Sequence, residues 1–115
     1  MPAPAPPRLV VRRSDGDTVV RLTDCPSITE FNAEVVGAEI ERAVADGGAA
    51  HLILDLSDVE FIASVGLGKL IGLNGRLRSR GGKLTLRNPR PMIREVLMVT
   101  CLDRVIDIEP DTPPA

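Results

Sequence analysis

The sequence predicts an α/β fold, a single domain in which helices pack against a central, mixed β-sheet. The chain has 115 residues, which is the usual size of one domain. Short, β-branched apolar segments alternate along it with longer segments in which apolar residues recur at helical spacing. Glycine pairs and an Asp-Gly pair separate these segments. Alternating strands and helices form sheets that are at least partly parallel, so we predict the order β-β-α-β-α-β-α-β.

The two ends of the chain differ in composition from the middle. Seven of the ten prolines lie in residues 1–7 and 110–115. Proline removes a backbone donor and disfavours helix, so we expect two disordered tails, the first rich in proline and alanine. The folded domain is then residues 8–109.

The first half of this domain predicts a hairpin and a helix. Two β-branched strands, residues 9–11 and 18–22, flank the Asp-Gly pair. A helix then follows Thr29 and ends at the Gly-Gly pair of residues 47–48. Five apolar residues form its expected buried face: Phe31, Val35, Val36, Ile40 and Val44.

The second half continues the alternation. Residues 51–56 are almost continuously apolar, as in a strand that is covered on both faces. A helix over about residues 65–80 ends at a second Gly-Gly pair, and the alternating segment 83–87 predicts a strand with one face in solvent. Pro91 suits the first turn of a helix that extends to about residue 100. Residues 105–108 predict a last short strand.

The composition excludes several classes of function. The formal net charge is -2 and the only aromatic residues are Phe31 and Phe61, so we expect no nucleic-acid binding and no aromatic ligand cage. No apolar run approaches the ~18 residues of a membrane span, and the N-terminus lacks the pattern of a secretory signal. We therefore expect a cytoplasmic protein without direct membrane insertion. Cys25 and Cys101 are expected to be reduced thiols that pack as small apolar groups.

Charge is segregated along the chain. Residues 15–60 carry eleven acids against two arginines, whereas residues 61–94 carry eight bases and no acid. A solvated face explains most such runs, and cations are favoured in the last turns of a helix. The alternative is a surface for an acidic partner or for lipid headgroups.

Catalytic constellations find little support in the sequence. His51 is the only histidine, and no cluster of residues has the spacing of metal ligands. Asp55, Asp58 and Glu60 are candidates for a general acid–base pair, but a solvated loop is the stronger interpretation.

The segment GLGK at residues 66–69 does not match a phosphate-binding loop. A Walker loop needs a glycine and a hydroxyl residue where Ala63 and Leu70 stand. The dinucleotide-binding fingerprint needs a glycine where Ile71 stands. We therefore expect neither a cofactor nor a metal.

Ser64 stands where the second helix is expected to begin. One interpretation is a helix N-cap, whose hydroxyl accepts a hydrogen bond from a free amide of the first turn and contributes ~1 kcal/mol. The other is a phosphorylation site, because a phosphate there faces free N–H groups and the positive end of the helix dipole. It would add nearly two negative charges to an apolar surface formed by Ile62, Val65 and Leu67.

Glycines are unusually dense in the same helix. Each interior glycine costs a helix ~0.5–1 kcal/mol relative to alanine. Gly68, Gly72 and Gly75 share one face, which leaves that side of the helix bare. Either the protein's own elements pack closely there, or another protein does. The opposite face is expected to be mostly apolar and consists of Leu67, Leu70, Ile71, Asn74 and Leu77.

The segment DLSDVEFIASVGLG at residues 55–68 resembles the signature of STAS domains, in particular that of the bacterial anti-sigma-factor antagonists. The common form of that signature is D-L-S-x-V-x-F-[IM]-D-S-[ST]-G-L-G. Further matches are RGGKL at residues 80–84, the pairs Asn88-Pro89 and Val96-Leu97, and TCLDR at residues 100–104. The resemblance covers about residues 8–109.

This resemblance implies a small, non-enzymatic partner switch. Family members in the unphosphorylated form bind an anti-sigma factor that is also a serine kinase. The kinase phosphorylates a serine at the start of the second helix and thereby ends the binding, and a PP2C-type phosphatase restores it. Ser64 aligns with that serine. The implied partner-binding residues are Ile62, Ala63, Ser64, Val65, Gly66, Leu67, Gly68 and Gly72.

Two positions depart from the signature and leave alternatives open. Ala63 replaces the acidic residue before the serine, and Val65 replaces the following Ser or Thr. One alternative is a STAS interaction module that binds constitutively, without phosphorylation. A second is a STAS subunit bound to the ATPase of a membrane lipid ABC transporter, which Ala63 and the arginine-rich second half motivate. A nucleotide-binding protein or hydrolase ranks last, and the sequence leaves self-association open.

Overall fold

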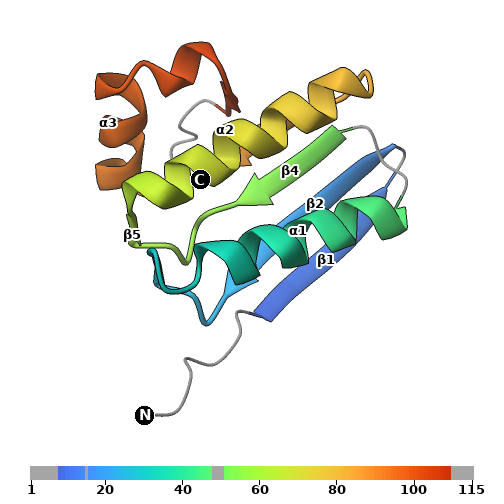
Figure 1. Cartoon of the computed structure of the whole chain (residues 1–115), viewed down its shortest axis with the longest axis horizontal. Helices are drawn as coiled ribbons and strands as arrows, with labels where there is room; N and C mark the ends of the chain where they lie inside the picture. Colours follow the sequence, from blue (N-terminus) through green and yellow to red (C-terminus); the bar gives the residue numbers. More distant parts are fainter. Residues whose placement is uncertain (1–7, 15, 48–50, 110–115) are drawn as a thin grey trace, which may run out of the picture.

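A five-stranded mixed sheet forms the centre of the fold (Figure 1). The computed structural model describes residues 8–14, 16–47 and 51–109, so both expected tails, Asp15 and Gly48 lie outside the described residues. The strand order is β1-β2-β4-β6-β7, in which β1 is antiparallel to β2 and all other neighbours are parallel. These strands are β1 (Arg8–Ser14), β2 (Asp17–Thr23), β4 (His51–Asp55), β6 (Lys83–Arg87) and β7 (Asp107–Ile108).

Three helices complete the predicted order of elements. Helices α1 (Ala33–Gly47) and α2 (Ser64–Ser79) lie side by side across one face of the sheet. Helix α3 (Pro91–Val99) lies near the N-terminal end of α2 and contacts the short strand β5 (Phe61–Ile62). The predicted α/β architecture with a mixed sheet is therefore confirmed.

The hydrophobic core lies between the sheet and helices α1 and α2. Strand residues alternate between the two faces of a sheet, so every second residue points to the helices. The side chains that do so on the three central strands are fully shielded from solvent: Val20, Leu22, Leu52, Leu54, Leu84 and Leu86.

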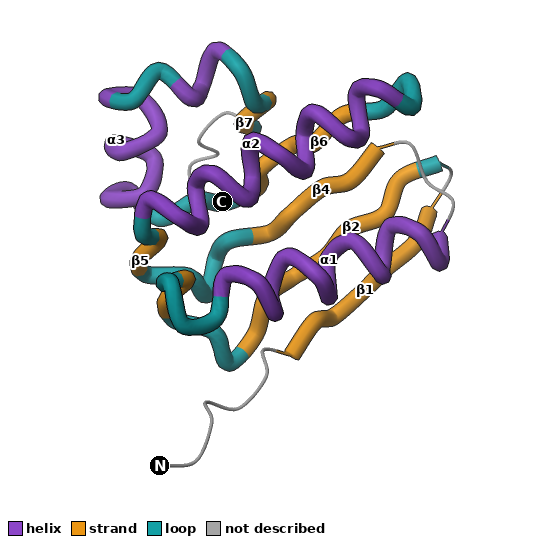
Figure 2. Tube along the Cα trace, in the orientation of Figure 1, coloured by secondary structure: helices purple, strands orange, loops and turns teal. Residues whose placement is uncertain are grey.

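A second, two-stranded sheet fixes the segment that leads into α2 (Figure 2). Strand β3 (Ser27–Ile28) pairs in parallel with β5, so that Ile28 lies opposite Ile62. The Ala63 amide extends this pairing by donating to the Ile28 carbonyl at 2.7 Å. The sequence does not predict this sheet, because a two-residue strand has no periodicity to detect.

Helix α1 begins at Ala33, later than expected. The Asn32 side chain accepts a hydrogen bond from the Thr29 amide at 2.8 Å, and the Ala33 amide donates to the Thr29 carbonyl at 2.9 Å. This local turn precedes the helix, because short polar side chains compete with helical hydrogen bonds. Phe31 therefore lies outside the helix and is 80% exposed, so its expected place on the buried face is wrong. Val35 is also exposed.

The C-terminal strand is shorter than expected. A 3-10 helix, η1 (Leu102–Arg104), follows α3 and leaves Val105 exposed outside the sheet. It begins after Cys101, whose φ of 61° lies in the left-handed region. Cys25 is buried as expected, and burial raises the pKa of its thiol. Cys101 is exposed, so the expectation that both thiols are packed is wrong for that residue.

Candidate partner-binding site at the start of α2

Ser64 is the first residue of α2, and its side chain is exposed. The N-cap position belongs to Ala63, and no side-chain hydrogen bond caps the helix. The N-cap interpretation of Ser64 is therefore wrong by one position. The first amides of a helix lack partners within the helix, so the N–H groups beside Ser64 are oriented toward a group placed at the helix start.

Ser64 is exposed, but neighbouring residues on both sides of it in the sequence are buried and fix its position. Ile62 is 7% exposed and Leu67 is 9% exposed, and Gly66 is buried between them in sequence. A Cβ atom added to Gly66 would lie 2.7 Å from Cγ2 of Ile62 and 2.8 Å from Cγ2 of Ile28. Glycine at position 66 therefore permits α2 to pack directly on the β3–β5 sheet. Of the partner-binding residues implied by the resemblance, these three belong to the core and position the surface residues.

The outward ridge of α2 consists of Val65, Gly68, Gly72 and Gly75. Val65 is 39% exposed, and nothing lies within 4 Å of a Cβ atom added to Gly68 or Gly75. At Gly72 the nearest neighbour of an added Cβ is the guanidinium of Arg76 at 3.4 Å. The fold itself therefore does not require small residues along this ridge, whereas it does at Gly66.

The buried face of α2 differs from the expected face at two positions. Ile71 is 41% exposed, and Leu73, which the sequence argument missed, is buried in its place. Asn74 is buried as expected, and both ends of its side-chain amide form hydrogen bonds. The amide nitrogen donates to the Val105 carbonyl, and the amide oxygen accepts from the Leu84 backbone N–H. These two bonds fasten α2 to β6 and to the segment before β7.

The bases of residues 61–94 are mostly paired with acids from other parts of the chain. Lys69 and Arg76 of α2 pair with acids of α1, and Lys83, Arg87 and Arg90 pair with acids elsewhere. The hydrogen bond that Arg87 donates to Glu109 raises the pKa of Arg87, although desolvation opposes this effect. The segment that looks strongly basic in sequence is therefore largely neutralised in three dimensions.

The carboxylates at the end of β4 and in the loop after it each have a partner within the protein. Asp58 accepts two hydrogen bonds from the Arg21 guanidinium, at 3.1 and 3.2 Å. Asp55 accepts from the Ser57 amide at 2.9 Å, and Glu60 lies 3.9 Å from Arg90. This arrangement supports the loop interpretation over an acid–base pair.

His51 joins a chain of hydrogen bonds on the sheet face opposite the helices. Its Nδ1 lies 2.9 Å from Asp17 Oδ1, and its Nε2 lies 2.8 Å from Thr85 Oγ1. This order of acid, imidazole and hydroxyl resembles a catalytic triad. Thr85 is only 3% exposed, however, and its hydroxyl donates to Asp107 at 3.1 Å, so it is not available to a substrate. The same network satisfies the hydroxyl of Thr85, which is buried although its face of the sheet was expected to be in solvent.

Two further properties of the described residues bear on function. No three His, Cys, Asp or Glu side chains within the described ranges gather as metal ligands do. Among the helices that the structure describes, none combines the length and the apolar composition needed to cross a bilayer.

Comparisons with known proteins agree with this geometry. The family model described as "STAS domain" matches residues 8–115. An anti-sigma factor antagonist from Mycobacterium paratuberculosis has a crystal structure with a TM-score of 0.76 and 30% identity, covering 91% of this chain and 86% of that one. The anti-sigma F factor antagonist of Paenibacillus polymyxa is 23% identical over 93 residues, which are 81% of this chain and 78% of the relative.

The fold is also that of SpoIIAA, a Bacillus cell fate determinant whose structure is known in unphosphorylated and phosphorylated forms. The TM-scores are 0.70 and 0.64, at 22% identity and 90% coverage of this chain in both cases. The chain covers 90% and 93% of those two structures. The chain belongs to the STAS domain family, among the anti-sigma factor antagonists.

Proposed function

We propose that this protein is an anti-sigma factor antagonist whose binding is controlled by phosphorylation of Ser64. In the unphosphorylated form it binds an anti-sigma factor that is also a serine kinase, and it acts in the cytoplasm without enzymatic activity of its own. Phosphorylation of Ser64 by that kinase ends the binding, and a PP2C-type phosphatase restores it. The observation that carries the proposal is the exposed Ser64 at the first position of α2, beside an exposed ridge of small and apolar residues.

The physical effect of a phosphate at this position supports a switch. It adds about two negative charges to a surface where Val65 and Gly68 are exposed and uncharged. The free amides at the start of α2 stabilise the phosphate in the isolated protein, so the fold tolerates it. A partner that covers Ser64 must remove water from the phosphate, and desolvation of an unpaired charge is costly. Phosphorylation therefore opposes binding without unfolding the protein.

The proposed contact surface is narrower than the set of residues that the resemblance implies. It consists of the exposed or half-buried residues around Ser64, and the buried residues Ile62, Gly66 and Leu67 only support it. The contact residues are Ala63, Ser64, Val65, Gly68 and Gly72. Val65 leaves Ser64 as the sole hydroxyl at this junction. Ala63 stands where the signature has an acidic residue, so the proposed kinase must recognise Ser64 without that carboxylate.

The decisive experiment uses the cognate anti-sigma factor. The protein is incubated with it and ATP, and the phosphate is located by mass spectrometry. Affinity is then measured by isothermal titration calorimetry for the wild type, Ser64→Ala and Ser64→Asp, with Ser79→Asp as the control because Ser79 is exposed at the other end of α2. We expect Ser64→Asp to weaken binding by about a hundredfold, and Ser64→Ala to bind without becoming phosphorylated.

Three results contradict the proposal in distinct ways. Phosphate on another residue, or full affinity of Ser64→Asp, excludes Ser64 as the switch. Tight binding with no phosphorylation at all indicates a constitutive module. Association with a membrane-bound ATPase instead of an anti-sigma factor indicates a transporter subunit. That alternative was motivated by the arginine-rich segment, whose bases largely have acidic partners.

A further inference from the structure

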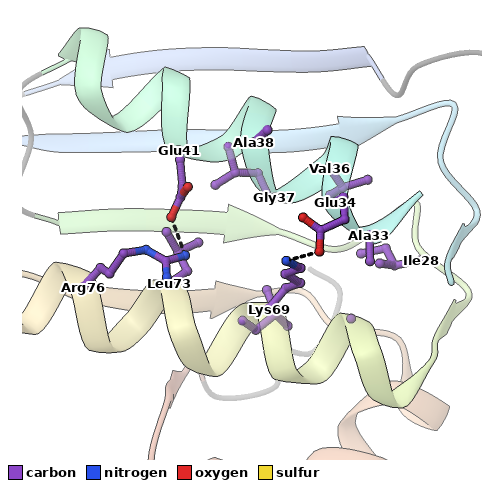
Figure 3. Close-up of a pocket in the computed structure, with 13 residues that line it drawn as sticks. Ile28, Ala33, Glu34, Val36, Gly37, Ala38, Glu41, Lys69, Leu73 and Arg76 are labelled. Atoms are coloured by element: carbon purple, nitrogen blue, oxygen red, sulfur yellow. Dashed lines mark ion pairs between the residues drawn. The ribbon is translucent and has the colours of Figure 1, made fainter. Parts of the chain in front are cut away.

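A small cavity lies between α1 and α2, next to the outward ridge of α2 (Figure 3). Its volume is about 110 Å³. Its lining is largely apolar and includes Val36 and Ile40 from α1 and Leu70 and Leu73 from α2. Gly37 also lines the cavity and contributes no side chain, and a Cβ atom added there would lie 3.7 Å from Lys69 Cδ.

Two ion pairs border this cavity. Lys69 Nζ lies 2.5 Å from Glu34 Oε1, and Arg76 pairs with Glu41 in the same way. The two acids are seven residues apart on α1 and the two bases are seven residues apart on α2, so the pairs lie two helical turns apart. Each charge is balanced by its neighbour, so the border carries no net charge and favours an uncharged guest.

The size of the cavity limits the guest to one side chain. An apolar cavity of about 150 Å³ holds a benzene molecule. The somewhat smaller volume here, about 110 Å³, fits the branched aliphatic side chain of valine, leucine or isoleucine. The side chain of Glu34 is 83% exposed and that of Arg76 is 55% exposed, so the border of the cavity faces solvent.

The neighbouring ridge explains how a partner reaches the cavity. Gly68, Gly72 and Gly75 have no side chains, so the backbone on the outer side of α2 is accessible to a partner. Gly72 is adjacent to Arg76, which borders the cavity. A segment that lies across this ridge therefore comes close enough to place a side chain between the two helices. We propose that the cavity receives one branched aliphatic side chain of the anti-sigma factor that binds at Ser64. This inference rests on the proposed function, because it assigns a second contact to the same partner.

The first test needs only the protein itself. Xenon is titrated into wild-type protein and the methyl resonances of Val36, Ile40, Leu70 and Leu73 are followed by NMR, since xenon enters open apolar cavities. Gly37→Ala is the matched control, because the added Cβ lies 3.7 Å from Lys69 Cδ, an ordinary contact that leaves the cavity open. Gly37→Leu is designed to fill the cavity, because Gly37 belongs to its lining. We expect saturable shifts in the wild type and in Gly37→Ala, and none in Gly37→Leu. Wild-type resonances that do not respond overturn the proposal.

The second test uses the cognate anti-sigma factor. We expect Gly37→Ala to bind within about twofold of the wild type, and Gly37→Leu to bind at least tenfold more weakly because one aliphatic side chain loses its site. Both variants are first checked by urea unfolding, and Ala38→Leu, which enlarges another residue of the cavity lining, replaces Gly37→Leu if that variant fails to fold.

The outcomes separate this inference from the proposed function. Equal affinity of Gly37→Leu and Gly37→Ala overturns the cavity contact, and loss of binding in Ser64→Asp in the same experiment leaves the switch intact. An anti-sigma factor that binds none of the proteins, wild type included, overturns both.

Discussion

Gly66 is the position at which the packing of α2 can be tested most sharply. In Gly66→Ala, the new Cβ meets the Cγ2 methyls of Ile28 and Ile62 at 2.8 and 2.7 Å. Both isoleucines are nearly fully buried, and β-branched side chains have few alternative rotamers. The methyls therefore cannot turn away, and α2 must shift against the β3–β5 sheet.

The expected magnitude follows from two opposing effects. Overpacking a core costs about 1–3 kcal/mol, whereas replacing glycine by alanine inside a helix gains up to about 1 kcal/mol. Because the two methyls are held rigidly, we expect Gly66→Ala to lower the free energy of unfolding by about 1–2 kcal/mol. The same substitution at Gly68 or Gly75 meets open space, so only the helix-propensity gain of about 0.5–1 kcal/mol applies there.

Urea unfolding of the three alanine variants measures this difference directly. The midpoint should fall for Gly66→Ala and rise for Gly68→Ala and Gly75→Ala, with unchanged m-values. A Gly66→Ala midpoint as high as that of Gly68→Ala would refute the steric argument. The Gly68 variant also bears on function, because a more stable protein that binds its partner more weakly would show that the partner approaches the bare ridge.

Three further predictions concern residues outside α2. The hydroxyl of Thr18 is buried without a hydrogen-bond partner among the described residues, so Thr18→Val should raise the free energy of unfolding by about 1 kcal/mol in urea, and a loss of stability would argue against it. Cys101 has a φ of 61°, so Cys101→Gly should stabilise the protein by about 1 kcal/mol, as a higher Tm would show, whereas Cys101→Ala should not. A hydrogen bond from Lys83 is the main cause of the lowered pKa of Asp107. Desolvation opposes this effect, and a second hydrogen bond, from the Thr85 hydroxyl, lowers the pKa further. A lowered pKa stabilises the folded state above the unfolded value of about 3.9, and this stability is lost as the pH falls through the folded value. Asp107→Asn should therefore flatten the acid side of the stability profile below about pH 4, and an unchanged slope would contradict the assignment.

The start of α2 shows how far local pattern alone can specify this protein. The apolar strand after His51, the loop and the glycine-rich helix beginning near Ser64 are all features of contiguous sequence. Hydrophobic periodicity and turn residues act over a few neighbours, so they predicted these elements and their order. The resemblance of the same segment to a known family then identified Ser64 as the residue to examine.

The pairing of charges required the tertiary structure. In sequence, Arg76 and Arg87 belong to a run of bases without acids, but in the fold they face Glu41 and Glu109 from distant segments. Ion pairs form between residues that the sheet and helices bring together, and nothing in the local pattern marks them. Most bases of this run therefore have acidic partners, which agrees with a solvated face rather than with the alternative of a surface for an acidic partner or for lipid headgroups.

The sequence by itself determined the class of fold, the order of its longer elements and the position of Ser64 at the start of a helix, because these depend on local periodicity and on a contiguous signature. Only the tertiary structure decided which glycine of α2 is required by packing and which glycines have open space where a side chain would lie. Gly66 and Gly68 both lie in the first turns of the same helix, but a Cβ atom added to Gly66 meets Ile28 and Ile62, whereas one added to Gly68 meets nothing within 4 Å. Contacts between β3 and α2 make that distinction, since they join residues far apart in the chain and depend on how the elements pack.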